Sequence, residues 1–168
     1  MNYFELFGIP VQLKPKPAQL SGKFFELSKK FHPDYTANEP AAIQAEALEK
    51  SALLNKAWKT FQNSDTTIRY VLMEKGLMQE EEKYELPPDF LMEVMDINEQ
   101  LMDFDASSDK DQLATIISQL SSEIYEPVKE IIENYKDDAV TQEELLQVKE
   151  YYYKKKYLDR MSRELSSK

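Results

Sequence analysis

The 168-residue chain contains no cysteine, a single histidine, three glycines and no long apolar run. The lack of cysteine excludes disulfides, thiol nucleophiles, iron–sulfur ligation and thiolate zinc sites. One histidine, His32, cannot make a multi-histidine metal site, and three glycines provide no phosphate-binding loop. No stretch approaches the roughly 18 apolar residues of a membrane span, and the first residues lack the basic start of a secretory signal. We therefore expect a cytoplasmic protein that needs no metal or other cofactor.

The charge of the chain is acidic and unevenly distributed. Lys and Arg number 21 against 31 Asp and Glu, a net charge of -10, which argues against a nucleic-acid-binding surface. Residues 1–76 carry 10 basic and 8 acidic residues, whereas residues 77–168 carry 11 basic and 23 acidic ones. Gly76, an acidic run and the pair Pro87-Pro88 mark the change. We therefore predict two domains, residues 1–76 and 88–168, joined by a linker over residues 77–87.

Apolar residues in the first half recur every three or four positions, which is the spacing of helices with one buried face. The pattern predicts helices over residues 3–7, from residue 17 to about 32, from about 40 to 61, and over a short segment near residues 68–77. Pro33 disfavours helical geometry in the residue before it, so the second helix should end there. The predicted buried positions are Leu20, Phe24, Leu27 and Phe31 in the second helix and Ala47, Leu54, Trp58 and Phe61 in the third.

The second half predicts three longer helices that form a small bundle, so the expected fold class is all-α throughout. These helices cover residues 90–104, 113–135 and about 141–165, and Pro127 is expected to kink the second of them. The predicted buried positions are Phe90, Val94, Ile97, Leu101 and Phe104 in the first, Leu113, Ile116, Leu120, Ile124, Ile131 and Tyr135 in the second, and Leu145, Val148, Tyr152 and Met161 in the third.

The tripeptide His32-Pro33-Asp34 lies between two amphipathic helices. One interpretation is purely structural: Pro33 ends the helix, Asp34 caps a turn, and the lysines before it are a solvated helix face. Catalysis by His32 is a poor hypothesis, because a triad needs a nucleophile and an oxyanion hole that nothing in the sequence marks. Neighbouring carboxylates elsewhere are solvated charges rather than acid–base pairs. We therefore expect no enzymatic activity.

The context of this tripeptide resembles a J-domain. The order is Tyr3 to Gly8 (Tyr-Phe-Glu-Leu-Phe-Gly), a lysine-bearing helix, Phe-His-Pro-Asp, and a helix that contains Asn-Lys-Ala-Trp at residues 55–58. The resemblance implies a co-chaperone that stimulates ATP hydrolysis by a DnaK-type chaperone, with lysines that attract an acidic surface of the ATPase and a turn that engages its interdomain linker. The residues it assigns to chaperone binding are His32, Pro33, Asp34, Lys23, Lys29 and Lys30.

The first helix of the second half has more apolar residues than one buried stripe needs. Leu91, Met92, Met95 and Met102 fall outside the predicted stripe. They could pack against the first domain or remain exposed for a partner, and methionine suits a partner surface because its side chain adapts to varied shapes. The acidic neighbours Glu93, Asp96, Glu99 and Asp103 would frame a contact with a basic partner.

This segment also resembles the C-terminal bundle of the HscB family, the J-proteins of iron–sulfur cluster biogenesis. The similarity rests on Phe-Leu-Met-Glu at residues 90–93, on Met95 and Ile97, and on Lys-Tyr-Leu-Asp-Arg at residues 156–160. It implies binding of the cluster scaffold IscU and presentation of that scaffold to the ATPase HscA. Without a cysteine-bearing module the chain resembles the bacterial form, and the run Lys154–Lys156 could neutralise the acidic bundle. The scaffold-binding residues implied are Leu91, Met92, Met95 and Tyr157, with Glu93 and Glu99 as a polar rim.

Two alternatives remain open at this point. A J-domain protein could deliver a different client to a DnaK-type chaperone, or the His-Pro-Asp turn could be incidental in a structural helical protein. The first predicts chaperone stimulation that is indifferent to the scaffold, and the second predicts no stimulation at all. Neither a nucleic acid nor a membrane is an expected partner.

Overall fold

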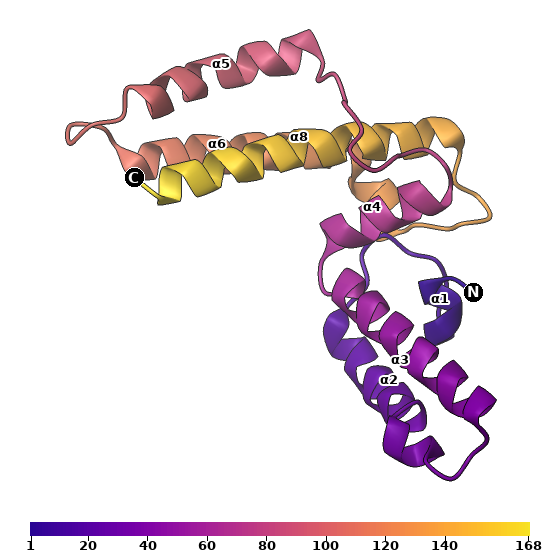
Figure 1. Cartoon of the computed structure of the whole chain (residues 1–168). Coiled ribbons are helices and arrows are strands. Elements are labelled where there is room, and N and C mark those ends of the chain that lie inside the picture. The colour runs from indigo at the N-terminus through magenta and orange to yellow at the C-terminus, as the bar shows by residue number, and fades with distance from the viewer. The chain divides into compact units, whose positions relative to one another are not determined.

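A computed structural model describes residues 1–168, and every regular element in it is a helix, so the predicted all-α class is confirmed (Figure 1). The residues group into two compact units, one of Met1–Glu74 with Tyr135–Ala139 and one of Lys75–Asn134 with Val140–Lys168. The helices are α1 (Tyr3–Phe7), α2 (Pro17–Lys30), the 3-10 turn η1 (Pro33–Thr36), α3 (Ala41–Phe61), α4 (Ser64–Glu74), α5 (Pro88–Met102), α6 (Lys110–Tyr125), the 3-10 turn η2 (Glu126–Val128), α7 (Lys129–Glu133) and α8 (Gln142–Ser166).

The first unit is a helical hairpin of α2 and α3 that α1 and α4 complete. Asn2 and Glu5 cap the start of α1 reciprocally, and Gly8 ends it at a φ of 65°, a left-handed conformation that glycine adopts without steric cost. Aromatic rings hold α1 on the hairpin: Phe4 and Phe7 each lie 5.1 Å from the ring of Phe61. α1 is therefore an integral part of this core, although it is only five residues long.

Trp58 joins the two long helices of the hairpin. Its indole stacks on Phe24 of α2 at 4.6 Å and lies parallel to Phe7 of α1 at 6.4 Å. Ala57 beside it is completely buried, and its small side chain allows the neighbouring helices to approach closely. Phe24 and Trp58, which the spacing places on the inward faces of their helices, stack on each other there and are half-buried.

The second unit is a bundle in which α6 and α8 lie side by side and α5 runs along them (Figure 1). Asp109 caps α6, and a capping box of Thr141 and Glu144 starts α8. Leu86 of the preceding segment packs against the core. That core consists of Phe90, Val94, Ile97 and Leu101 from α5, Leu113, Ile117 and Leu120 from α6, and Leu158, Met161 and Leu165 from α8.

Pro127 ends a helix where we predicted a kink. α6 stops at Tyr125, η2 carries the proline, and the short α7 follows, so no continuous helix reaches Tyr135, which groups with the first unit. A proline inside a helix removes a backbone donor and clashes with the preceding turn, and here the chain tightens into a 3-10 turn before the short α7 begins.

Three predicted core positions are shifted by one residue. Tyr151 rather than Tyr152 is buried in α8, and Ile132 rather than Ile131 is buried in α7. In α6 Ile117 belongs to the core, while Ile116 packs at its edge. Where two apolar residues are neighbours, a spacing of three or four fits either one, so the pattern alone does not decide which of them faces inward.

Candidate partner-binding sites

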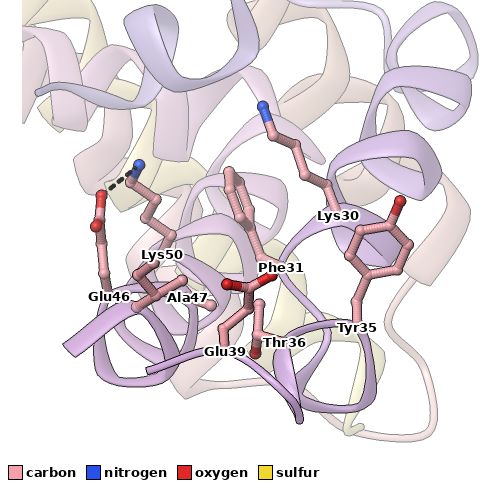
Figure 2. Close-up of a pocket in the computed structure, with 9 residues that line it drawn as sticks. Lys30, Phe31, Tyr35, Thr36, Glu39, Glu46, Ala47 and Lys50 are labelled. Carbon is pink, nitrogen blue, oxygen red and sulfur yellow. Dashed lines mark ion pairs between the residues drawn. The ribbon is translucent and has the colours of Figure 1, made fainter. Parts of the chain in front are cut away.

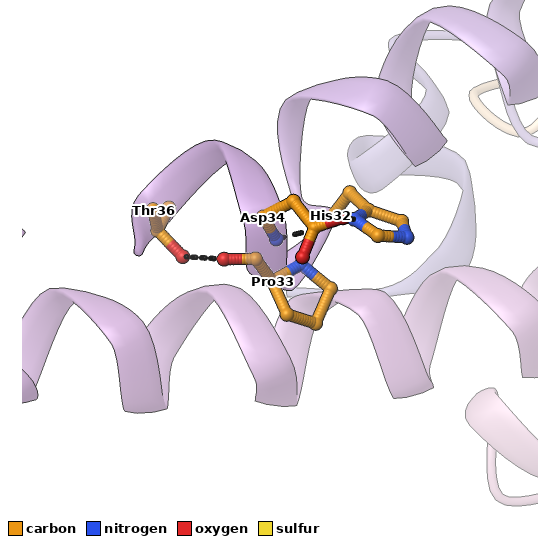
Figure 3. Close-up of polar contacts among 4 residues, drawn as sticks. All are labelled: His32, Pro33, Asp34 and Thr36. Atoms are coloured by element: carbon orange, nitrogen blue, oxygen red, sulfur yellow. Dashed lines mark hydrogen bonds and ion pairs between the residues drawn. The ribbon is translucent and has the colours of Figure 1, made fainter. Parts of the chain in front are cut away.

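The His-Pro-Asp turn is a short 3-10 helix on the surface of the hairpin (Figure 3). His32 precedes it in extended geometry, and its Nδ1 accepts a hydrogen bond from the backbone N–H of Asp34 at 3.2 Å. The Tyr35 N–H donates to the His32 carbonyl at 2.9 Å, and the Thr36 hydroxyl donates to the Pro33 carbonyl at 3.3 Å. These bonds fix the turn before any partner binds.

The two polar side chains of this turn are open to solvent. The Asp34 side chain is 95% exposed and that of His32 is 58% exposed, and the Asp34 Oδ2 lies 3.7 Å from the His32 Nδ1. Because Nδ1 is an acceptor, the neutral imidazole carries its proton on Nε2, which can donate outward. The turn therefore offers one donor and one carboxylate in a fixed arrangement, with no nucleophile beside them.

The three predicted lysines lie on α2, close to the turn. Lys23 and Lys30 are two turns apart on one flank, and Lys29 lies about 100° further around the helix. Lys23 reaches Glu26 at 4.0 Å, whereas Lys30 lies over the Phe31 ring at 5.6 Å. Lys29 and Lys30 are exposed, so their charges are available to an acidic partner.

A hollow of about 380 Å³ opens beside the turn, where the end of α2 meets the start of α3 (Figure 2). Phe31 and Ala47 form its apolar floor, and the 75% exposed Tyr35 stands at its rim. Lys50 closes another side, where it pairs with Glu46 at 2.9 Å. Sequence reasoning missed Tyr35, an exposed aromatic residue within the turn itself, although aromatic residues are enriched at protein contact surfaces.

An apolar stripe runs along the solvent side of α5. Leu91 is 43% exposed, Met92 70%, Met95 54% and Met102 83%, while the opposite side of the helix is completely buried in the core. At 100° per residue these four side chains lie within about a quarter of a turn of the helix surface. We call this surface the α5 stripe. None of these four residues belongs to the buried core of the bundle.

Tyr157 of α8 borders the α5 stripe. Its ring meets Phe90 edge-on at 6.0 Å, and its hydroxyl accepts a hydrogen bond of 2.6 Å from the side-chain amide of Asn98 on α5. Asn98 lies on α5 between the buried face and Leu91, so the structure brings Tyr157 to the stripe's edge. Sequence reasoning missed Asn98, a lone amide beside an apolar stripe.

The two predicted rim glutamates lie on different flanks of α5. Glu99 lies between Met95 and Met92 around the helix and lines an acidic hollow with Asp96 and Asp103. Glu93 instead lines a separate hollow with Leu120 and other residues of α6 and α8. By helix geometry Glu93 lies about 160° from Met95, so the two residues cannot contact the same flat surface.

Neither unit contains a recognisable metal centre or membrane-spanning helix. No group of three or more potential ligand side chains of the types His, Cys, Asp or Glu converges on one point. None of the helices combines the length and the apolar character needed to cross a bilayer.

Comparison with known proteins identifies the family. Residues 86–166 match the model of the HSCB C-terminal oligomerisation domain. The chain is 34% identical to the co-chaperone protein HscB homolog of Aliivibrio salmonicida over 153 residues, which cover 81% of this chain and 90% of the relative. The chain belongs to the HscB family of co-chaperones. The HscB homolog of Vibrio vulnificus is also 34% identical, over 83% of this chain and 82% of the relative.

Solved structures agree with this membership of the HscB family. Chaperone HscB from Vibrio cholerae superposes with a TM-score of 0.72 at 26% identity, covering 99% of this chain and 96% of that one. The human co-chaperone protein HscB shares the fold, with a TM-score of 0.77 at 23% identity over 99% of this chain and 81% of that one. The family resemblance inferred from the sequence is thus confirmed, and with it the role of a co-chaperone.

Proposed function

We propose that this co-chaperone binds the iron–sulfur scaffold IscU and stimulates the ATPase of a DnaK-type chaperone, HscA, to promote cluster transfer. In this proposal residues 1–76 act as the J-domain, residues 77–87 as a linker and residues 88–168 as the scaffold-binding bundle. The chain works in the cytoplasm, where ATP and both partners meet. It performs no chemistry of its own, because bridging two partners raises their effective concentration without a catalytic residue.

The observation that supports the proposal is that one chain exposes two distinct features on different helices. One is the exposed and hydrogen-bonded His-Pro-Asp turn, and the other is the α5 stripe. The bundle core is complete without the stripe, so its apolar side chains are free for a partner. An apolar centre bordered by Tyr157 and Glu99 has the composition of a protein interface.

On the J-domain, charge and geometry have separate roles. Lys23, Lys29 and Lys30 attract an acidic surface of the ATPase and mainly raise the association rate. Asp34 and His32 then contact the ATPase from a turn whose backbone is already ordered, so little conformational entropy is lost on binding. The turn therefore determines whether the ATPase responds, while the lysines determine how fast the complex forms.

The test is steady-state ATP hydrolysis by HscA, and separately by a general DnaK-type chaperone, with and without IscU. Asp34→Asn and His32→Gln should abolish stimulation, whereas the control Glu49→Gln, an exposed acidic residue of α3, should retain it. Lys29→Glu should weaken stimulation more than its control, Lys59→Glu. Both changes place a negative charge in the last turn of a helix, so their unfavourable interaction with the helix dipole is similar. Full stimulation by Asp34→Asn would contradict the proposal.

A second candidate within the same class is a J-domain protein with a different client. The exposed α5 stripe is compatible with that reading, because it indicates a protein partner without naming one. Stimulation that does not increase with IscU would favour this alternative. No stimulation of either ATPase would contradict both.

A further inference from the structure

A second hollow of the bundle is basic, although the bundle as a whole is acidic. It measures about 420 Å³ and lies between the segment that precedes α5 and the outer face of α8. Four exposed cations line it, out of the 11 that residues 77–168 contain. We call this site the basic hollow. Its lining residues are Glu82, Lys83, Tyr84, Leu86, Tyr153, Lys156, Tyr157, Arg160 and Arg163.

The cations of the basic hollow differ from the other lysines of α8. Lys154 pairs with Glu150 at 3.4 Å and Lys155 pairs with Asp159 at 2.9 Å, so these two neutralise the bundle's own acids. Lys156, the third residue of the same run, has no acidic partner within the chain.

Lys83, Arg160 and Arg163 are likewise without an ion pair, and the Arg160 guanidinium lies over the Tyr157 ring at 4.8 Å. Four cations gathered around one hollow repel one another, so an anion placed among them would be bound favourably.

The acidic residue of the basic hollow is already neutralised. Glu82 accepts a hydrogen bond from Lys149 at 2.8 Å and another from the Tyr153 hydroxyl at 2.9 Å. These bonds, that of Lys149 first, hold the pKa of Glu82 below its ordinary value. Tyr84 stacks on Tyr153 at 4.4 Å and fixes this wall in place. The hollow is thus a built site with a net positive lining.

The basic hollow is continuous with the α5 stripe. Tyr157 lines the hollow and accepts the hydrogen bond of Asn98, which lies one helical turn from Met95 and from Met102 of the stripe. On the other side of the stripe lies the acidic hollow of Asp96, Glu99 and Asp103. Cations, apolar side chains and carboxylates therefore follow one another across a single surface of the bundle.

We propose that the basic hollow binds an acidic segment of the same scaffold protein that occupies the α5 stripe. This inference rests on the proposed function and specifies the chemistry of its partner: an apolar centre with carboxylates on one side and basic residues on the other. Arginine suits this role because its planar group binds a carboxylate through two parallel hydrogen bonds. Opposite charges on the two sides of the stripe admit one orientation of the scaffold and oppose the reverse one. An extended polyanion such as a nucleic acid is a poorer occupant, because the surrounding bundle would repel it.

The test is a double charge reversal, Arg160→Glu with Arg163→Glu, compared with Lys110→Glu with Lys129→Glu. The control pair lies in the same bundle, outside the basic hollow, and changes the net charge by the same amount. Association and dissociation rates with purified IscU are measured by surface plasmon resonance at 50 mM and 500 mM salt. Thermal unfolding verifies that each variant is folded. At low salt we expect at least a tenfold weaker affinity for the arginine variant, mostly in the association rate, and less than threefold for the control. At high salt the difference should shrink, because charge attraction is screened.

Equal effects of the two variants would overturn the inference. If Met92→Ala with Met95→Ala weakens IscU binding while the arginine variant behaves as its control, the proposed function stands and the basic hollow has no part in it. If the unmodified chain does not bind IscU, the proposed function fails as well. In a second experiment, surface carboxylate residues of IscU are replaced by lysine one at a time, and the affinity of each IscU variant for the arginine variant is measured. Restored binding by one of them supports the inference, and restoration by none overturns it.

Discussion

The α5 stripe allows the loss of binding energy on truncation to be worked out from the structure. Met92 and Met95 are 70% and 54% exposed, so together they leave slightly more than one methionine side chain uncovered. Complete burial of such a side chain contributes about 1.5–3 kcal/mol, and the exposed part of the two residues therefore contributes about 2–4 kcal/mol to a complex that covers them. Met92→Ala with Met95→Ala should raise the Kd for IscU about 30- to 700-fold, at 1.4 kcal/mol for each factor of ten.

The assay for this prediction is calorimetric titration of IscU into each variant, with urea unfolding in parallel. Because both side chains already face solvent and alanine favours helices, the free energy of unfolding should change by less than about 0.5 kcal/mol. Leu146→Ala is the matched control, since Leu146 is 44% exposed but lies on α8, away from the α5 stripe. Equal binding by the double variant and the control would refute the reasoning, and so would a bundle that melts when the stripe is truncated.

The other predictions concern the stability of the two units. Leu158→Ala, at a completely buried position of the bundle core, should lower the free energy of unfolding by about 2–5 kcal/mol in urea titration, and a loss below about 1 kcal/mol would contradict the core assignment. Glu82→Gln should cost about 1 kcal/mol at pH 7. The hydrogen bond from Lys149 lowers the pKa of Glu82 below 4.5, so this stabilisation is present above pH 4.5 and is lost as the pH falls through the lower folded-state pKa; the variant should show a flatter acid dependence in pH-resolved melting. Gly8→Ala should destabilise the chain by about 1 kcal/mol because φ is positive there, whereas Gly22→Ala, inside α2 with open space around it, should stabilise it by about 0.5–1 kcal/mol; thermal melts that give both changes the same sign would contradict this.

The sequence predicts the helices well because each one buries a single stripe with a clear period. It predicts less well where the local pattern fits two answers. Tyr151 and Tyr152 are adjacent and both aromatic, so only packing against the other helices decides which is buried. At Pro127 the sequence indicates a disturbance, but whether a helix bends or ends depends on the contacts that follow.

The candidate sites divide in the same way. The His-Pro-Asp turn and the α5 stripe are visible in the sequence because neighbouring residues form them. Helix geometry alone would also have separated Glu93 from Met95, since the two positions lie about 160° apart. The contact between Asn98 and Tyr157 joins residues 59 positions apart. Lys155 and Lys156 are neighbours in the sequence, and only the ion pair of Lys155 with Asp159 distinguishes it from the unpaired Lys156. Such relations become visible only when the helices are in place.

The most direct test of the central claim is whether the two contact surfaces must lie in one chain. HscA hydrolysis is measured in the presence of IscU with the unmodified chain, with Asp34→Asn, with the double variant Met92→Ala and Met95→Ala, and with an equimolar mixture of the two variants. Each variant keeps one of the two surfaces intact, so a bridging mechanism predicts that the unmodified chain gives the IscU-dependent increase and that the mixture does not restore it. An increase restored by the mixture would contradict the account, because the two surfaces would then act separately.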